Sequence, residues 1–202
     1  MNIDHIMHIA PVITVLVLDG ALDPVALAEA LVEAGLPVIE VTLRTSTALS
    51  AIRAMVEVEG AIVGAGTVLD ADQLGEAIGA GAKFIVSPGL TERLARAVID
   101  SGVAYLPGIA SAGDIMRGLD LGLTDFKFFP AEAAGGLPAL SALAAPFPQA
   151  RFCPTGGIRA DTAADWLAHP SVVCVGGSWL VPPGETDLAA IATRARAAAQ
   201  LR

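Results

Sequence analysis

The chain repeats one unit along its length: a short run rich in Val, Ile and Phe, a break that contains Gly, Thr or Pro, and a stretch rich in Ala and Leu. Eight such runs recur at intervals of roughly 20 to 26 residues, which is typical of strands that alternate with helices. The predicted strands cover residues 12–18, 38–42, 61–64, 84–86, 104–107, 125–128, 151–155 and 172–176.

The predicted strands are apolar on both faces, which indicates a parallel sheet covered by helices. Eight βα units close most naturally into a barrel, so we predict an α/β fold, a single-domain (β/α)8 TIM barrel over residues 1–202. An open, doubly wound sheet is the alternative, but the first strand–helix turn lacks the GxGxxG pattern of dinucleotide-binding folds. Helices are expected to begin at good capping residues, which are Asp23, Asp70, Ser111 and Asp161.

Composition and charge exclude several classes of partner. Hydrophobic residues make up 54% of the chain, yet no run reaches the ~18 apolar residues of a membrane span. The net charge is −9 without a basic cluster, which argues against nucleic acid or an anionic membrane as a partner. The N-terminus shows no export signal, so we expect a cytoplasmic protein. We expect Cys153 and Cys174 to be reduced and buried, with a regulatory pair as the alternative.

Lys127 stands among three phenylalanines in FKFFPAE, on a run predicted to be a strand. Desolvation disfavours the protonated form of a lysine, and a neutral lysine adds to carbonyl carbons. Lys127 is therefore a candidate nucleophile. The alternative is a lysine whose stem passes its apolar neighbours to reach solvent or an ion-pair partner.

Polar residues also alternate along VIEVTLRT, where Glu40, Thr42 and Arg44 share one face and the residues between them share the other. Catalytic groups of a TIM barrel project from the C-terminal ends of its strands, so we expect this polar face inside the barrel. Glu40 is then placed as a general acid/base and Arg44 as a clamp for a substrate carboxylate. A structural ion pair of Glu40 with Lys127 or Arg44 is the alternative.

Glycine pairs follow the last two predicted strands, in CPTGGI and VGGSWL. They are either tight turns or the backbone N–H groups of the phosphate site that this fold builds after strands seven and eight. Such a site needs no basic patch, which suits an acidic chain. Hydroxyl donors from Thr155 and Ser178 could assist. Thr67 and Pro88 end the third and fourth strands, where they could touch the ligand, although Pro88 could equally be a structural turn.

Six motifs in this order, VIEVTLRT, IVGAGTVL, SPGLTE, FKFFPAE, FCPTGGI and GGSWLVP, resemble the class I pyruvate aldolases of the KHG/KDPG type, from about Pro11 to the last helix. The resemblance implies a homotrimeric (β/α)8 lyase of the Entner–Doudoroff pathway. Its substrate would be a phosphorylated keto-deoxy sugar acid, 2-dehydro-3-deoxy-6-phosphogluconate (KDPG), cleaved to pyruvate and glyceraldehyde 3-phosphate, often with activity on 4-hydroxy-2-oxoglutarate.

The resemblance also implies a role for each matching residue. Lys127 would form the Schiff base, Glu40 would be the general acid/base, and Arg44 would bind the pyruvate carboxylate. Thr67, Pro88 and Phe129 would form the pyruvate pocket, and Thr155 would contact a substrate hydroxyl. The phosphate cradle would consist of Gly156, Gly157, Gly177 and Ser178. The first strand, ITVLVL, departs from some relatives because it lacks an arginine near the phosphate.

No cofactor or metal is expected, because the three histidines are scattered and form no ligand cluster. A metal-dependent class II aldolase is therefore disfavoured. The alternatives that stay open are the galactonate-derived epimer as substrate, a sugar-phosphate isomerase or epimerase in which Lys127 only neutralises an enediolate, and a non-catalytic phosphosugar-binding barrel. The resemblance of Thr155 to the gluconate branch favours the gluconate series.

Overall fold

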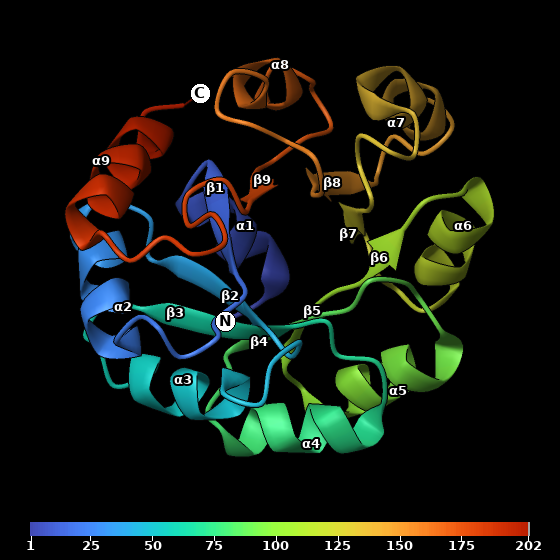
Figure 1. Cartoon of the computed structure of the whole chain (residues 1–202). Coiled ribbons are helices and arrows are strands. Elements are labelled where there is room, and N and C mark those ends of the chain that lie inside the picture. The colour runs from blue at the N-terminus through green and yellow to red at the C-terminus, as the bar shows by residue number, and fades with distance from the viewer. Residues whose placement is uncertain (202) are drawn as a thin grey trace.

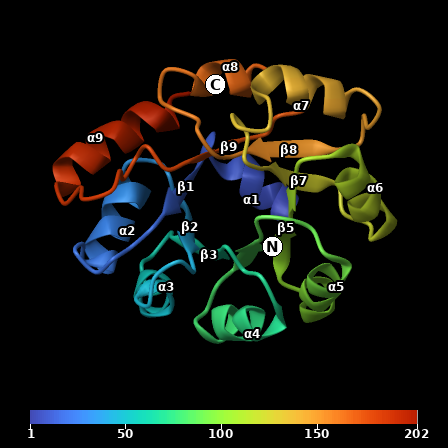
Figure 2. The same cartoon turned by 45° about the vertical axis from the view of Figure 1, so that its right-hand side comes forward.

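A computed structural model describes residues 1–201 of the chain. Strands form a ring with helices around its outside (Figure 1), and a turned view shows the same arrangement (Figure 2). The strands are β1 (Val12–Leu16), β2 (Val38–Thr42), β3 (Ile62–Gly66), β4 (Phe84–Val86), β5 (Ala104–Leu106), β6 (Gly108–Ile109), β7 (Asp125–Phe128), β8 (Arg151–Pro154) and β9 (Val175–Gly177). The helices are α1 (Ile3–Ile9), α2 (Pro24–Glu33), α3 (Ala48–Met55), α4 (Ala71–Gly79), α5 (Glu92–Ser101), α6 (Ala112–Asp120), α7 (Gly136–Ala144), α8 (Ala163–Leu167) and α9 (Leu188–Ala199).

All strand pairs are parallel and follow one another around the ring. One sheet has the order β5-β4-β3-β2-β1-β9 and the other β6-β7-β8. The predicted strand 104–107 divides at Pro107 into β5, which pairs with β4, and β6, which pairs with β7. A bridge between Thr155 and Gly176 closes the ring between β8 and β9. The predicted barrel is thus confirmed.

Side chains alternate between the interior of the ring and the layer under the helices. On β2, Ile39 and Val41 join the core between strands and helices, whereas Val38 belongs to a separate core inside the ring. Glu40 and Thr42 share the parity of Val38 and are buried inside. The expected inward face is therefore confirmed for Glu40 and Thr42, whereas Arg44 lies past the end of β2 and is exposed.

α1 closes the N-terminal end of the barrel, and the sequence analysis did not predict it. Its buried residues Ile6 and Met7 pack in the interior core against residues that begin strands, among them Val38 and Phe84. Asp4 of α1 lies 2.8 Å from a guanidinium nitrogen of Arg151, at the start of β8. The helix is thereby held across the bottom of the ring, as its central position in Figure 1 shows.

Helix caps confirm three of the four expected starts. The side chains of Asp23, Asp70 and Ser111 accept backbone N–H groups of α2, α4 and α6, and Ser111 forms a full capping box. Asp161 is a wrong prediction, because α8 begins after Thr162 and the Asp161 carboxylate instead pairs with Arg159 at 3.0 Å.

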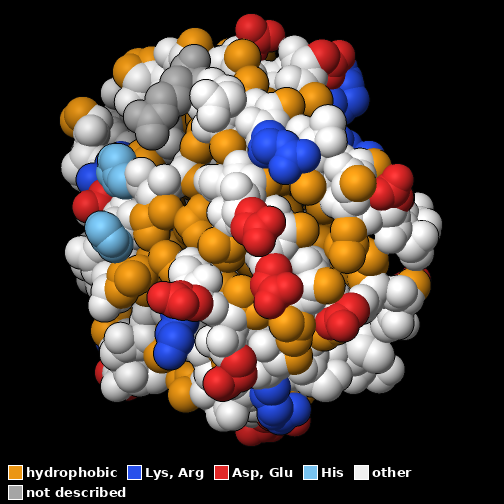
Figure 3. Space-filling view, turned by 90° about the vertical axis from the view of Figure 1, so that its left-hand side faces the viewer, with side chains coloured by type: hydrophobic (Ala, Val, Ile, Leu, Met, Phe, Trp, Pro, Cys, Tyr) orange, Lys and Arg blue, Asp and Glu red, His pale blue; other side chains and the backbone are white. Residues whose placement is uncertain are grey.

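The outer surface agrees with the acidic composition. The face beside α9 and α2 shows carboxylates scattered among apolar side chains, with few basic ones (Figure 3). Within residues 1–201, no helix is both long and apolar enough to cross a membrane.

Candidate active site

Lys127 and Glu40 form a buried ion pair inside the barrel. Lys127 projects from β7 and Glu40 from β2, and Nζ lies 3.0 Å from Oε1 and 3.4 Å from Oε2. The two side chains are only 7% and 2% exposed. The Phe129 ring centroid lies 5.4 Å from Nζ, within reach of a cation–π contact. The predicted nucleophile and the predicted acid/base are therefore in direct contact, in the geometry that an ion pair also requires.

Two glycines of β3 make room for this interior. A Cβ at Gly66 would overlap the Glu40 side chain, lying 2.7 Å from Cγ and 2.8 Å from Cδ. A Cβ at Gly64 would overlap the Phe84 ring in the same way. Their spacing of two residues, in the segment VGAG, is the sequence signal that both face inward.

Arg44 lies beyond the end of β2, on the open side of the barrel. Its Nε donates to Oγ1 of Thr67 over 3.3 Å. Thr67 has a φ of +60°, and it is alone among the non-glycine residues of the described chain in having a positive value. A left-handed threonine costs about 1–3 kcal/mol, and such strain is concentrated at functional sites. Arg44 and Ser178 both line a cavity of about 340 Å³.

Two carboxylates on the rim of that cavity, Asp19 and Glu185, were not found from the sequence. The backbone N–H of Asp187, followed by the Arg194 side chain, holds the pKa of Glu185 below its ordinary value. Glu185 is therefore a carboxylate at neutral pH. Glu185 is paired with Arg194 at 2.8 Å, and Arg44 lines the same cavity, so this cavity carries charges of both signs.

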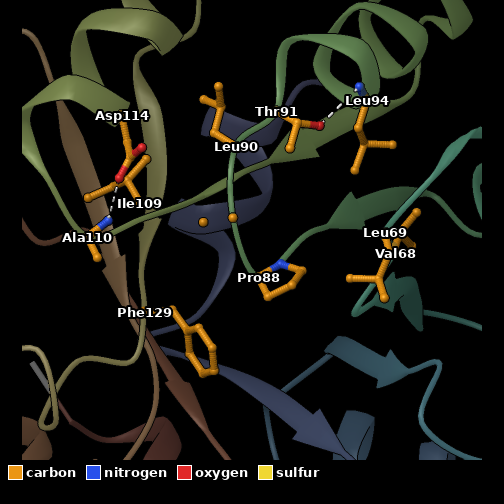
Figure 4. A pocket seen from close by; sticks show the side chains of 12 residues that line it. Val68, Leu69, Pro88, Leu90, Thr91, Leu94, Ile109, Ala110, Asp114 and Phe129 are labelled. Atoms are coloured by element: carbon orange, nitrogen blue, oxygen red, sulfur yellow. Dashed lines mark hydrogen bonds between the residues drawn. The ribbon is translucent and has the colours of Figure 1, made fainter.

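Pro88 and Phe129 face a second cavity of about 350 Å³, which lies beside β6 and beyond the ends of β3 and β4 (Figure 4). Its walls are mostly apolar, with Val68, Leu90 and Ile109 among them. Lys127, Arg44 and Thr67 are not among its lining residues, so the part of Pro88 and Phe129 in a pyruvate pocket stays a prediction.

The two glycine loops lie side by side, because Thr155 bridges to Gly176. Gly156 and Gly157 have φ values of +103° and +83°, a conformation in which only glycine is free of strain. Gly177 has a different environment: a Cβ there would lie 2.7 Å from the Trp179 ring and 2.8 Å from Val12. The absence of a side chain at Gly177 makes room for this packing, and its part in a phosphate cradle stays a prediction.

The two cysteines lie inside the barrel as free, buried thiols. Cys153 pairs in register with Lys127. A hydrogen bond with Cys153, followed by burial, raises the pKa of Cys174 well above its ordinary value. Cys174 is therefore a neutral thiol below the ion pair.

Comparison with known proteins identifies the family. The family model described as KDPG and KHG aldolase matches residues 3–194. The chain belongs to this family. It is accordingly an aldolase, a carbon–carbon lyase. A 2-dehydro-3-deoxy-phosphogluconate aldolase of Zymomonas mobilis is 54% identical over 201 residues, which cover 100% of this chain and 97% of that relative.

Two solved structures of aldolases are closely similar. The 2-keto-3-deoxy-6-phosphogluconate aldolase of Zymomonas mobilis, solved with 3-phosphoglycerate, has a TM-score of 0.96 at 54% identity, covering 98% of this chain and 95% of its own. The KDPG aldolase of Legionella pneumophila has a TM-score of 0.92 at 41% identity and 96% coverage of both chains. That structure contains pyruvate captured at low pH as a covalent carbinolamine intermediate.

Proposed function

We propose that this aldolase cleaves KDPG to pyruvate and glyceraldehyde 3-phosphate through a Schiff base on Lys127. The observation that carries the proposal is the buried contact of 3.0 Å between Lys127 Nζ and Glu40 Oε1. The pair can thus supply both a nucleophile and a proton donor.

The proposed cycle begins when the Nζ lone pair attacks the C2 carbonyl of the substrate. The carbinolamine hydroxyl takes up the proton that the Lys127 ammonium released before the attack, and loss of water then gives an iminium on Lys127. Glu40 takes the proton of the C4 hydroxyl, the C3–C4 bond breaks, and its electron pair moves to C3 to form an enamine while glyceraldehyde 3-phosphate leaves. Protonation at C3 and addition of water to C2 then release pyruvate and restore the amine.

The other residues bind the two ends of the substrate in this proposal. Arg44 pairs with the carboxylate of the α-keto acid, and Thr67 holds Arg44 through the contact of 3.3 Å. Pro88 and Phe129 enclose the pyruvyl part, with Thr155 at a substrate hydroxyl. The phosphate end is bound by backbone N–H groups of the loops that contain Gly156, Gly157, Gly177 and Ser178.

The family description includes KHG aldolase, which supports a second activity on 4-hydroxy-2-oxoglutarate. From the resemblance we also propose one domain, a cytoplasmic location, a place in the Entner–Doudoroff pathway and a homotrimer. Light scattering on the purified protein would measure the subunit number.

Borohydride reduction in the presence of pyruvate tests the chemistry, and the sequence makes the assay clean because Lys83 and Lys127 are its two lysines. We expect one reduced pyruvate adduct on Lys127 and none on the exposed Lys83. Lys127→Arg keeps the charge but cannot form an imine, so it should abolish both the adduct and nearly all turnover, whereas Lys83→Arg should change neither. More than about a hundredth of the activity in Lys127→Arg would favour the isomerase alternative, in which charge suffices.

A further inference from the structure

The loop of Gly156 and Gly157 has no side chains with which to fix its own shape. Both glycines have left-handed backbone, and Gly157 is exposed. Glycine is the most flexible residue in an unfolded chain, so neighbouring segments must hold such a loop if its N–H groups are to converge on an anion.

The neighbouring segment is the end of the FKFFPAE motif. The Ala131 N–H donates to the Thr155 carbonyl over 2.8 Å, and the Glu132 N–H donates to the Gly156 carbonyl over 3.0 Å. The stem of Glu132 lies against Gly157, since a Cβ on that glycine would be 2.7 Å from both Cβ and Cγ of Glu132. The Glu132 side chain thus borders the turn of the loop.

The Glu132 side chain is itself held by a tryptophan on α8, the helix that follows the Gly156–Gly157 loop in the chain. Its Oε1 accepts a hydrogen bond from Nε1 of Trp166 over 3.1 Å. Trp166 lies on α8, is only 2% exposed, and its ring centroid is 6.3 Å from that of Phe128 on β7. Because a carboxylate acceptor makes this bond stronger than a neutral one, it can hold an exposed side chain in one position.

We propose that Glu132 is a positioning residue for the phosphate end of the substrate, acting through its hydrogen bond to Trp166 and its contact with Gly157. This inference rests on the proposed function, because it needs the phosphate at the Gly156–Gly157 loop. The direction of the change in KDPG affinity distinguishes a positioning role from a simple effect of charge. Removing a negative charge near an anion should by itself improve binding, whereas loss of the positioning contact should weaken it.

The test compares KM for KDPG with KM for 4-hydroxy-2-oxoglutarate, which has no phosphate, in Glu132→Ala, Glu132→Gln and Trp166→Phe. We expect Glu132→Ala and Trp166→Phe to raise KM for KDPG about three- to tenfold, the range for one lost hydrogen bond. The kcat values and the KM for 4-hydroxy-2-oxoglutarate should stay within about twofold of those of the parent protein. Glu132→Gln keeps an acceptor for the indole and should bind KDPG at least as well as the parent. Glu76→Ala, on the distant helix α4, is the control for loss of one charge.

A lower KM for KDPG in Glu132→Ala would overturn the inference, because charge alone would then govern the site. An equal loss on both substrates, or a Glu132→Gln variant as impaired as Glu132→Ala, would overturn it as well. Thermal melting would show whether Trp166→Phe still folds, and Glu132→Ala tests the contact without changing the buried core. Failure of the parent protein to cleave either substrate would instead refute the proposed function, before any variant is compared.

Discussion

Adding one methyl group at Gly66 should impair catalysis without removing any catalytic group. The Cβ of an alanine there would lie 2.7 Å from Glu40 Cγ and 2.8 Å from Cδ. Carbon atoms in ordinary contact are about 3.5 Å apart, so the Glu40 side chain would have to retreat by about 1 Å. The contact of 3.0 Å with Lys127 Nζ would then be lost or badly stretched.

A misplacement of about 1 Å can cost 10²-fold in rate. We therefore expect kcat for KDPG cleavage to fall about 10²-fold in Gly66→Ala, equivalent to about 2.7 kcal/mol of transition-state stabilisation. Borohydride trapping of pyruvate on Lys127 should persist, because the amine itself is unchanged. Stopped assays of cleavage and mass spectrometry of the reduced adduct, on the same preparations, measure the two steps separately.

Gly75→Ala provides the matched control, because a Cβ at this position in α4 meets no atom within 4 Å. It should leave both steps unchanged and stabilise the helix by about 1 kcal/mol. A Gly66→Ala protein that folds normally and keeps kcat within about threefold of the parent would refute the assignment of Glu40 as a positioned acid/base. Loss of trapping together with cleavage would show that the methyl group disturbs Lys127 as well.

Further substitutions test the two ends of the site. Glu40→Gln should preserve trapping on Lys127 while cleavage and pyruvate C3 proton exchange fall roughly 10²- to 10⁴-fold; faster trapping with normal exchange would mean that Glu40 only paired with the ammonium. Arg44→Ala should weaken pyruvate and KDPG alike by about 2 to 5 kcal/mol, and unchanged pyruvate affinity in exchange assays would remove it from the carboxylate. Gly157→Ala should raise KM for KDPG more than for 4-hydroxy-2-oxoglutarate, and equal losses would place the phosphate elsewhere.

The barrel could be predicted because its physical cause is local. A strand buried on both faces is mostly apolar, so each of the eight runs carries its own signal. The predicted strands 38–42, 84–86 and 125–128 match the observed strands residue for residue. Ends were less predictable. The first strand ends at Leu16 rather than at residue 18, because the chain reaches the surface at Val17, which is 53% exposed.

Parity along β2 predicted that Glu40 would face inward, and FKFFPAE singled out Lys127, because a polar residue in an apolar strand needs a partner. The contact between them depends on β2 and β7 meeting across the barrel, which no short-range pattern contains. The sequence signal of α1 was also weak, because the helix has only seven residues and its ion pair with Arg151 joins segments that are far apart in the chain. Glu132 is an exposed glutamate whose importance depends on Trp166, 34 residues away.

The helix across the bottom of the barrel also has a kinetic consequence. Ile6 and Met7 fill the interior at the N-terminal end of the barrel, so in the proposed cycle we expect reactants and products to share the opening at the carboxyl ends of the strands. In the proposed cycle the aldehyde must depart through it before water can reach the covalent three-carbon fragment. Exit of the aldehyde and entry of water are then successive events in the same passage. Raising the aldehyde concentration should therefore delay hydrolysis and favour re-formation of the carbon–carbon bond.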